Sequence, residues 1–285
     1  MKKEGKMLKK KLLVLVVGIL TLLLAACGSS NSSSDNVVKV GTTAAEEPTW
    51  NLVKELAAEE DIEMEIITFD DYVQPNLTLD NDEIDLNAFQ TIVYFDSFVE
   101  DRGLDLSPIG TTAIWPMGIY SNEISNINEL KDGDQVIIPK DPTNLGRALS
   151  LLQKAGVITL EEGFSGTGGL EGIAENPKNL DIVPVDSAQT ARGLEDAAIS
   201  IINSDMAINS GLNPTNDPIF REDSSNKAYI NIIAAQTERK DDEVLNKIVD
   251  IYHTDEVSSF IEEEFGGAAV PVKEPISFLD DYKQN

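Results

Sequence analysis

The chain has 285 residues, 41% of them hydrophobic, so it is long and apolar enough to bury a substantial core. Fifty acidic residues against 22 basic ones give a formal charge of −28. This balance argues against a nucleic-acid-binding role, because phosphate backbones are bound through Lys and Arg. A single cysteine and a single histidine also exclude a disulfide framework and a zinc site built from these residue types.

The first 27 residues have the pattern of an export signal. A lysine-rich start precedes an apolar run from Leu12 to Ala26, which is shorter than the roughly 20 residues that span a bilayer. The run ends in Leu24-Ala25-Ala26-Cys27, which resembles the bacterial lipobox. The resemblance implies that Cys27 is acylated and that the signal peptide, residues 1–26, is removed. A permanent membrane span and an ordinary secreted protein are the alternatives.

Residues 27–36 form a predicted tether. After Cys27 they are mostly Ser, Asn and Gly, a composition typical of a flexible linker. Nine such residues have a root-mean-square reach of roughly 15–18 Å. The tether therefore separates the globular part from the membrane surface to which Cys27 would attach it.

Short apolar runs beyond the tether alternate with helical patterns. The runs predict buried strands at Val37–Gly41, Glu63–Phe69, Gln135–Pro139, Leu180–Val185, Ala198–Ile202 and Tyr229–Ala235. Apolar residues at helical spacing predict helices around Trp50 to Ala57, Leu145 to Leu152 and Val244 to Ile251. This alternation predicts an α/β chain.

Two breaks in the pattern suggest two lobes. One lies at Trp115 to Tyr120, and the other lies near Ile232 to Gln236. They predict a discontinuous first lobe of residues 37–116 and 235–285, and a second lobe of residues 117–234. A ligand site is expected in the cleft between them, where strand ends and helix N-termini converge.

The most informative stretch is 139–147, which reads PKDPTNLGR and joins a predicted strand to a predicted helix. Asp141 is placed to cap the helix, and Pro142 is placed in its first turn. Such a terminus offers unpaired backbone N–H groups, and Arg147 adds a planar set of donors suited to a carboxylate. The stretch thus fits a small carboxylate ligand, or else a plain helix start with a surface arginine.

Four stretches together resemble one family. Stretch 139–147, with FDDYVQPN at 69–76, DLNAFQ at 85–90 and ENPKNL at 175–180, is similar to the methionine-binding lipoproteins of ABC importers, the NlpA lipoprotein family. The resemblance covers roughly residues 37–272. It implies a two-lobed, periplasmic-binding-protein-like α/β fold with an amino acid held in the cleft between the lobes.

The family resemblance also implies individual roles. Asn144 and Arg147 match the positions that bind the carboxylate end of the ligand. Asn203 and Asn231 match the two further asparagines that bind the amino-acid backbone. Both follow or interrupt buried apolar runs, where an amide needs a hydrogen-bond partner. A well-bonded core amide is the alternative for each.

The family's apolar pocket for the ligand side chain maps to Tyr72, Phe89 and Tyr94. These rings suit a thioether through sulfur–aromatic contacts. Typical members carry a histidine where this chain has Thr91, and Trp115 stands where a tyrosine is common. The pocket is therefore expected to accept methionine, with D-methionine, a methionine-containing dipeptide or another apolar amino acid as alternatives.

Nothing in the chain predicts an enzyme. Its one histidine, His253, falls on a charged helix and is expected to be solvated, and the glycine-rich stretch 163–169 lacks the lysine of a phosphate loop. The acidic clusters lack the alternating ligands and glycine of a calcium loop. A surface adhesin with the same signal and tether is the remaining alternative, which the polar set at 144, 147, 203 and 231 argues against.

Family membership implies the role in transport. The chain would act as a monomer at the outer face of the bacterial cytoplasmic membrane, anchored by its lipid. It would deliver an amino acid to an ABC permease whose separate ATPase subunits hydrolyse ATP. No cofactor or metal is expected.

Overall fold

A computed structural model describes residues 37–282 of the chain. The predicted signal peptide, the lipid attachment at Cys27 and the tether lie outside the described residues. The chain divides into a unit ending at Val37 and a compact unit from Val38 onward, and the fold described below is that of the second unit. None of the helices in residues 37–282 combines the length and apolar character needed to cross a membrane.

The first half of the fold is a six-stranded mixed sheet in the order β13-β4-β12-β3-β1-β2. Its strands are β1 (Val37–Thr43), β2 (Glu63–Phe69), β3 (Leu86–Thr91), β4 (Leu106–Ile114), β12 (Ile230–Gln236) and β13 (Val270–Pro271). β1 runs parallel to β3, whereas β12 runs antiparallel to both β3 and β4. Five helices accompany this sheet: α2 (Glu47–Ala58), α3 (Gln74–Asp80), α4 (Ile92–Arg102), α7 (Glu243–Tyr252) and α8 (Asp255–Phe265).

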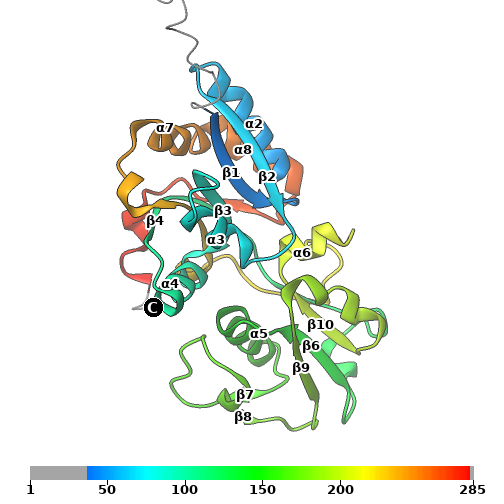
Figure 1. The fold of residues 1–285 in the computed structure, drawn as a ribbon. Helices are drawn as coiled ribbons and strands as arrows, with labels where there is room; N and C mark the ends of the chain where they lie inside the picture. The colour runs from blue at the N-terminus through cyan, green and yellow to red at the C-terminus, as the bar shows by residue number, and fades with distance from the viewer. Residues whose placement is uncertain (1–36, 283–285) are drawn as a thin grey trace, which may run out of the picture. The chain divides into compact units, whose positions relative to one another are not determined.

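The second half is a five-stranded sheet in the order β11-β5-β10-β6-β9. It contains β5 (Gly118–Tyr120), β6 (Gln135–Pro139), β9 (Asp181–Val185), β10 (Ile199–Ile202) and β11 (Phe220–Arg221), with helices α5 (Pro142–Lys154) and α6 (Ser204–Asn209). A separate pair, β7 (Thr159–Leu160) and β8 (Ile173–Glu175), lies beyond α5. Figure 1 shows this sheet and the six-stranded sheet in different halves of the described chain.

Each half has its own apolar core. In the first half, Trp50 and Val53 of α2 are fully buried with Leu245 and Ile248 of α7, and the Trp50 ring lies 5.2 Å from that of Tyr252. In the second half, the core gathers α5 and the central strands β6 and β10. Each sheet is therefore stabilised by its own set of buried apolar side chains.

The six predicted strands and three predicted helices are all present, with end points shifted by a few residues. Asp141 caps α5 by accepting from the backbone N–H of Asn144, and Pro142 opens the helix, as expected. One detail differs: Val244, the first apolar residue of the predicted helical pattern, is 43% exposed, and the buried face of α7 begins at Leu245. Strand β5 (Gly118–Tyr120) also occupies part of the segment from Trp115 to Tyr120, where the sequence suggests a break between lobes.

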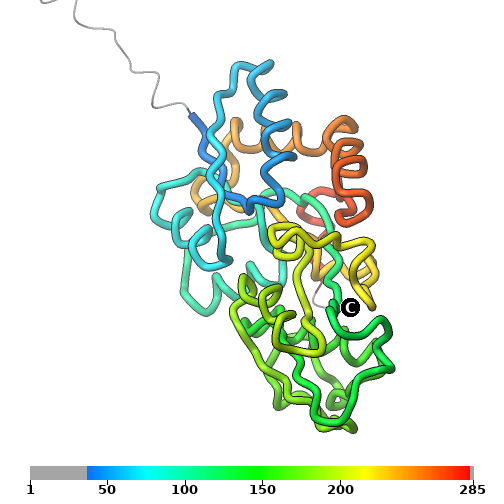
Figure 2. Tube along the Cα trace, turned by 90° about the vertical axis from the view of Figure 1, so that its right-hand side faces the viewer, coloured from blue at the N-terminus to red at the C-terminus, as the bar shows by residue number. Residues whose placement is uncertain are grey.

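The chain passes between the two halves at Trp115–Met117 and again before β12. Figure 2 shows the consequence, since blue, cyan, orange and red segments share one half and green segments fill the other. The division into lobes at residues 116 and 234 stays a prediction. Strand β12 joins the first sheet from Ile230 onward, a few residues ahead of the second predicted boundary.

Gly146 in α5 sets how closely the glycine-rich loop approaches the helix. A Cβ at this position would lie 2.3 Å from the backbone oxygen of Gly166. We expect Gly146→Ala to destabilise the protein by about 1–3 kcal/mol, because backbone must move to relieve the clash. Chemical denaturation measures this, with Lys154→Ala on the exposed end of the same helix expected within about 0.5 kcal/mol of wild type. Equal stability of the two variants would contradict the packing described.

Candidate functional site

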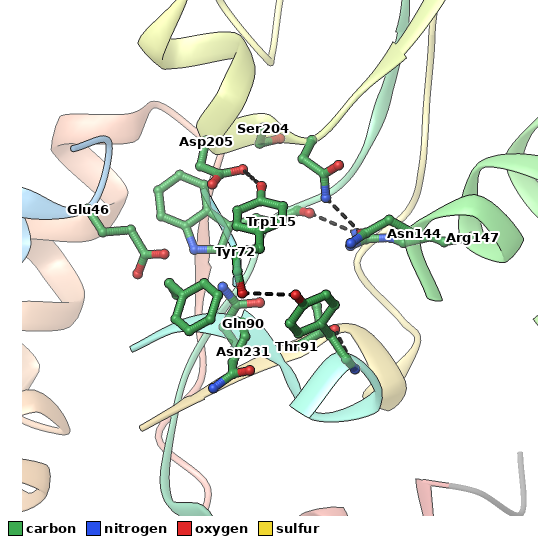
Figure 3. Close-up of a pocket in the computed structure, with 13 residues that line it drawn as sticks. Glu46, Tyr72, Gln90, Thr91, Trp115, Asn144, Arg147, Ser204, Asp205 and Asn231 are labelled. Atoms are coloured by element: carbon green, nitrogen blue, oxygen red, sulfur yellow. Dashed lines mark hydrogen bonds between the residues drawn. The ribbon is translucent and has the colours of Figure 1, made fainter. Parts of the chain in front are cut away.

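One cavity collects residues from both halves of the fold. The space at this site that protein atoms leave free amounts to about 390 Å³, and part of it is open to solvent. Its lining residues are Glu46, Tyr72, Phe89, Gln90, Thr91, Tyr94, Trp115, Asn144, Arg147, Asn203, Ser204, Asp205 and Asn231 (Figure 3). The structure thus brings together all eight residues that the sequence predicts as ligand-binding, and five more.

Arg147 is the cationic residue of the cavity lining, and it is 3% exposed. Its Nε and Nη2 groups donate to the carboxylate of Glu222, with Nη2 2.5 Å from Oε2. Nη2 also donates to the Trp115 carbonyl at 2.8 Å, and the guanidinium lies 4.2 Å from the centre of the Tyr229 ring. Burial alone would lower the pKa of Arg147, but the Glu222 carboxylate outweighs it and raises the pKa.

The same ion pair anchors a crossing between the halves. Glu222 accepts from the backbone N–H of Met117 at 3.1 Å, and Ser204 donates to the Pro116 carbonyl at 2.6 Å. Within residues 37–282 the remaining nitrogen of Arg147, Nη1, makes no hydrogen bond. Arg147 is therefore held by the protein on one side and leaves donor capacity for a ligand.

Asn144 and Asn203 belong to one hydrogen-bonded chain. Asn144 Nδ2 donates to both carboxylate oxygens of Asp141, and its Oδ1 accepts from Asn203 Nδ2 at 2.9 Å. The chain ends on Asn203 Oδ1, which is buried without a hydrogen-bond partner in the described part of the chain. An orphaned buried acceptor is costly unless a ligand donor reaches it.

Asn231 and Glu46 meet on the side of the first sheet. Asn231 lies opposite Thr91 in the β12–β3 pairing, and its side chain hydrogen-bonds with Glu46, which occupies the turn between β1 and α2. Glu46 is only 2% exposed. Burial raises its pKa well above the usual value, the charge of Asp205 raises it further, and the hydrogen bond with Asn231 lowers it in part.

Asp205, in the first turn of α6, approaches the cavity from the second half. Its Oδ1 accepts from the Tyr72 hydroxyl at 2.6 Å, which links the two halves, and its Oδ2 is buried without a partner of hydrogen-bonding geometry among residues 37–282. Burial raises the pKa of Asp205, whereas the Tyr72 hydroxyl, nearby backbone N–H groups and Arg147 act in the opposite direction.

An aromatic wall closes one side of the cavity. The centres of the Tyr72, Phe89 and Tyr94 rings lie 5.9 to 6.3 Å apart, and Tyr94 donates from its hydroxyl to the Tyr72 carbonyl. Trp115 faces the same space with its indole N–H buried and unpartnered in the described chain. The wall can enclose an apolar side chain, and the indole can donate to a ligand oxygen.

Thr91 lines the cavity and also stabilises the start of helix α4. Its hydroxyl caps α4 by accepting from the backbone N–H of Tyr94 at 3.2 Å. Behind it, Asn76, Asn87 and Gln90 are fully or nearly fully buried and hydrogen-bond with one another at 2.7 to 3.0 Å. This amide cluster fixes strand β3 and so positions both Phe89 and Thr91.

Sequence reasoning missed Glu46, Gln90, Ser204 and Asp205 as lining residues, and it noted Trp115 only as a departure from the family. It also missed Glu222, the partner of Arg147. A usable signal existed, because Glu46 follows β1 and Asp205 follows β10, and polar residues after strand ends are candidates for a cleft in α/β folds. No local pattern marks Glu222, which comes directly after the two-residue strand β11.

His253 is half-buried rather than solvated, which corrects the expectation from sequence. Its Nε2 atom lies 2.8 Å from the Thr111 carbonyl, so its role is to join α7 to β4. The described residues contain no cluster of His, Cys, Asp and Glu side chains able to hold a metal ion. The lining residues of the cavity offer hydrogen-bonding groups, charges and aromatic rings.

Two α/β halves with a polar cavity between them define the class of substrate-binding proteins with a two-lobed, periplasmic-binding-protein-like fold. The sequence profile of the NlpA lipoprotein family matches residues 38–273. The chain belongs to the NlpA lipoprotein family, which consists of binding proteins for transport and not of enzymes.

Individual relatives agree with this assignment. The D-methionine-binding lipoprotein MetQ of Salmonella typhi is 43% identical over 239 residues, which are 82% of this chain and 88% of that protein. A nutrient-binding protein from Burkholderia cenocepacia, solved bound to methionine, superposes with a TM-score of 0.80 at 39% identity, covering 82% of this chain and 99% of that one. Protein PG110 from Staphylococcus aureus superposes with a TM-score of 0.84 at 39% identity, covering 87% and 98%.

The raised pKa of Glu46 predicts a pH-dependent cost to the ligand-free fold. Above the ordinary glutamate pKa of about 4.5, the unfolded chain releases this proton while the folded chain retains it, so stability falls as pH rises and levels off above the folded pKa. Glu46→Gln removes the titratable carboxyl and with it this pH-dependent loss of stability. We expect the variant to melt above wild type at pH 8, by about 2–4 °C per kcal/mol recovered, with the gap closing near pH 4.

Scanning calorimetry across this pH range measures the difference. The exposed neighbour Glu47 provides the control, because Glu47→Gln should follow wild type at every pH. A Glu46→Gln variant that is less stable than wild type by the same amount at pH 4 and pH 8 would show that Glu46 is not held protonated by burial.

Proposed function

We propose that this chain is the substrate-binding lipoprotein of an ABC importer, which captures methionine in the cavity around Arg147 and delivers it to a membrane permease. The observation that carries the proposal is the cavity itself. It combines a buried guanidinium with a remaining donor, orphaned amide and carboxylate acceptors, and an aromatic wall. The names of the relatives at about 40% identity support methionine as the ligand.

In the proposed complex, the ligand's carboxylate accepts from Arg147 and from the Trp115 indole. Arginine suits this task, because it stays charged when buried and presents several donors in one plane. Asn144 contributes mainly by orienting Asn203, since its own amide is already bonded to Asp141 and Asn203. Asn203 and Asn231 bind the ligand's backbone groups from opposite halves of the fold.

The methionine side chain would lie against Tyr72, Phe89 and Tyr94. A thioether is polarizable and makes favourable contacts with aromatic rings, each worth about 0.3–1.5 kcal/mol. Thr91 is smaller than an imidazole and uses its hydroxyl to cap α4. This smaller side chain is the reason to include D-methionine and methionine-containing dipeptides among the ligands tested.

A ligand in this position touches both halves at once, and this supplies the mechanism of capture. Contacts made to both halves favour the closed arrangement over an open one, so binding shifts the population toward closure. The closed, loaded protein would dock on the permease, and a separate cytoplasmic subunit would hydrolyse ATP. We further propose that Cys27 carries the lipid, which holds this monomer at the outer face of the membrane.

Arg147 offers the sharpest test of the proposal, although Arg147→Ala is a poor choice. This change leaves the buried Glu222 carboxylate without its cationic partner, which costs about 3–5 kcal/mol of stability. Arg147→Lys keeps the charge and removes the planar donor set. We expect the lysine variant to fold and to bind methionine roughly 10- to 100-fold more weakly than wild type.

Isothermal titration calorimetry with L-methionine and D-methionine measures this loss. Lys154→Arg, an exposed change on the same helix, serves as the control and should keep wild-type affinity. Wild-type affinity in Arg147→Lys would rule out the carboxylate site. A wild-type protein that binds methionine no better than unrelated amino acids would rule out methionine as the ligand.

A further inference from the structure

Strand β3 carries one residue more than its neighbour β12 at the point where it forms the wall of the cavity. Ile232 of β12 lies opposite Gln90, and the next residue, Ile233, lies opposite Ala88. Phe89 is therefore the extra residue of a β-bulge, an irregularity that bends a strand and changes the direction of its side chains. Phe89 is 5% exposed and lines the cavity. This ring of the aromatic wall thus depends on an irregular piece of backbone.

The amide cluster of Asn76, Asn87 and Gln90 depends on the same bulge. Side chains alternate between the two faces of a regular strand, so residues three positions apart lie on opposite faces. Asn87 and Gln90 are three positions apart, yet Gln90 Nε2 donates to Asn87 Oδ1 at 3.0 Å. The extra residue brings both amides to one face, where Asn76 from the first turn of α3 meets them. The bulge and the cluster therefore stabilise each other.

Each amide of the cluster is hydrogen-bonded through both its nitrogen and its oxygen. Asn76 Oδ1 accepts from Asn87 Nδ2 at 2.9 Å and from Gln90 Nε2 at 2.7 Å, and Asn76 Nδ2 donates to Gln90 Oε1 at 2.7 Å. Asn87 Nδ2 also donates to the Pro75 carbonyl, which can only accept, so the direction of the whole cluster is fixed. Apolar side chains can pack in several ways, whereas a fully bonded buried network specifies one arrangement.

The cluster joins the two chain segments that carry the aromatic wall. Tyr72 lies four residues before Asn76, in the segment that leads into α3. Phe89 is the bulged residue of β3, and Tyr94 lies in the first turn of α4, which follows β3 directly. Because the cluster ties α3 to β3, it sets the distance between Tyr72 and the other two rings. The three ring centres lie 5.9 to 6.3 Å apart.

We propose that Asn76, Asn87 and Gln90 are positioning residues that set the selectivity of the protein for the ligand's side chain, by holding the bulge at Phe89. Asn76 and Asn87 are not among the residues that line the cavity, so they act through the wall and not by touching the ligand. Gln90 lines the cavity (Figure 3), but both ends of its amide are bonded within the cluster. The proposal rests on the function proposed above and deepens it, because it assigns selectivity to residues behind the wall.

Calorimetry with methionine and alanine tests the proposal, since alanine has the same backbone groups and no side chain that reaches the wall. Asn76→Leu keeps the size of the side chain and removes its hydrogen bonds. We expect this variant to bind methionine about 10-fold or more weakly than wild type, while alanine binding, measured by displacement, changes by less than about 3-fold. Leu79→Ala, a fully buried change on the same helix, is the matched control. It should lower the melting temperature by about 5–15 °C and keep both affinities.

A double-mutant cycle distinguishes positioning from general damage to the fold. Phe89→Leu alone should weaken methionine binding about 10-fold. Adding Asn76→Leu to Phe89→Leu should weaken it by less than about 2-fold further, because the side chain through which Asn76 acts is already gone. Should Asn76→Leu not fold, Asn87→Ala takes its place in both experiments, since Asn76 and Gln90 then keep their two mutual hydrogen bonds.

Three outcomes would overturn the proposal. The cluster variant keeps the wild-type preference for methionine, it loses methionine and alanine equally, or its effect multiplies with that of Phe89→Leu. If wild type prefers methionine and Arg147→Lys weakens that binding while the cluster variants change nothing, only the positioning role is wrong. If wild type binds methionine no better than alanine, the proposed function fails together with the positioning role.

Discussion

The buried ion pair between Arg147 and Glu222 is the interaction on which the site depends. Burying two charges costs several kcal/mol for each ion, and good geometry together with further hydrogen bonds must offset that cost. Here Glu222 also accepts a hydrogen bond from the Met117 N–H, and Arg147 also donates one to the Trp115 carbonyl. The pair therefore ties helix α5 to the crossing segment, and the ligand cavity is formed against that fixed point.

The distribution of polar groups follows from this arrangement. With its own anion supplied by the protein, the guanidinium is preorganised before a ligand arrives, so less conformational entropy is lost on binding. Asp141, Asn144 and Asn203 form a second fixed line of hydrogen bonds from the start of α5 to α6. The unpartnered acceptor Asn203 Oδ1 lies at the end of this hydrogen-bonded series. Its position is therefore set by the protein before a ligand binds.

Much of the secondary structure could be predicted from the sequence, because local periodicity marks the strands and helices. The start of α5 could be predicted as well, because Asp141 is a typical capping residue. Strand β3 was missed because its buried Asn87 and Gln90 break the apolar pattern, and only their partner Asn76, eleven residues or more away, makes their burial possible. Glu222 and Glu46 were missed for the same reason, since long-range pairing determines their environment. The family motifs supplied the eight lining residues. Without the motifs, Asn203 and Asn231 would have been interpreted as core amides and Arg147 as a surface residue.

The position of Trp115 has a practical consequence. The chain has two tryptophans, and Trp50 is buried in the first core against Tyr252 and is not one of the residues that line the cavity. Trp115 lies on the crossing segment, lines the cavity and packs its ring against Phe265. Changes in the intrinsic fluorescence of the protein during loading would therefore arise mainly from one side chain, which gives the protein a built-in optical reporter of occupancy.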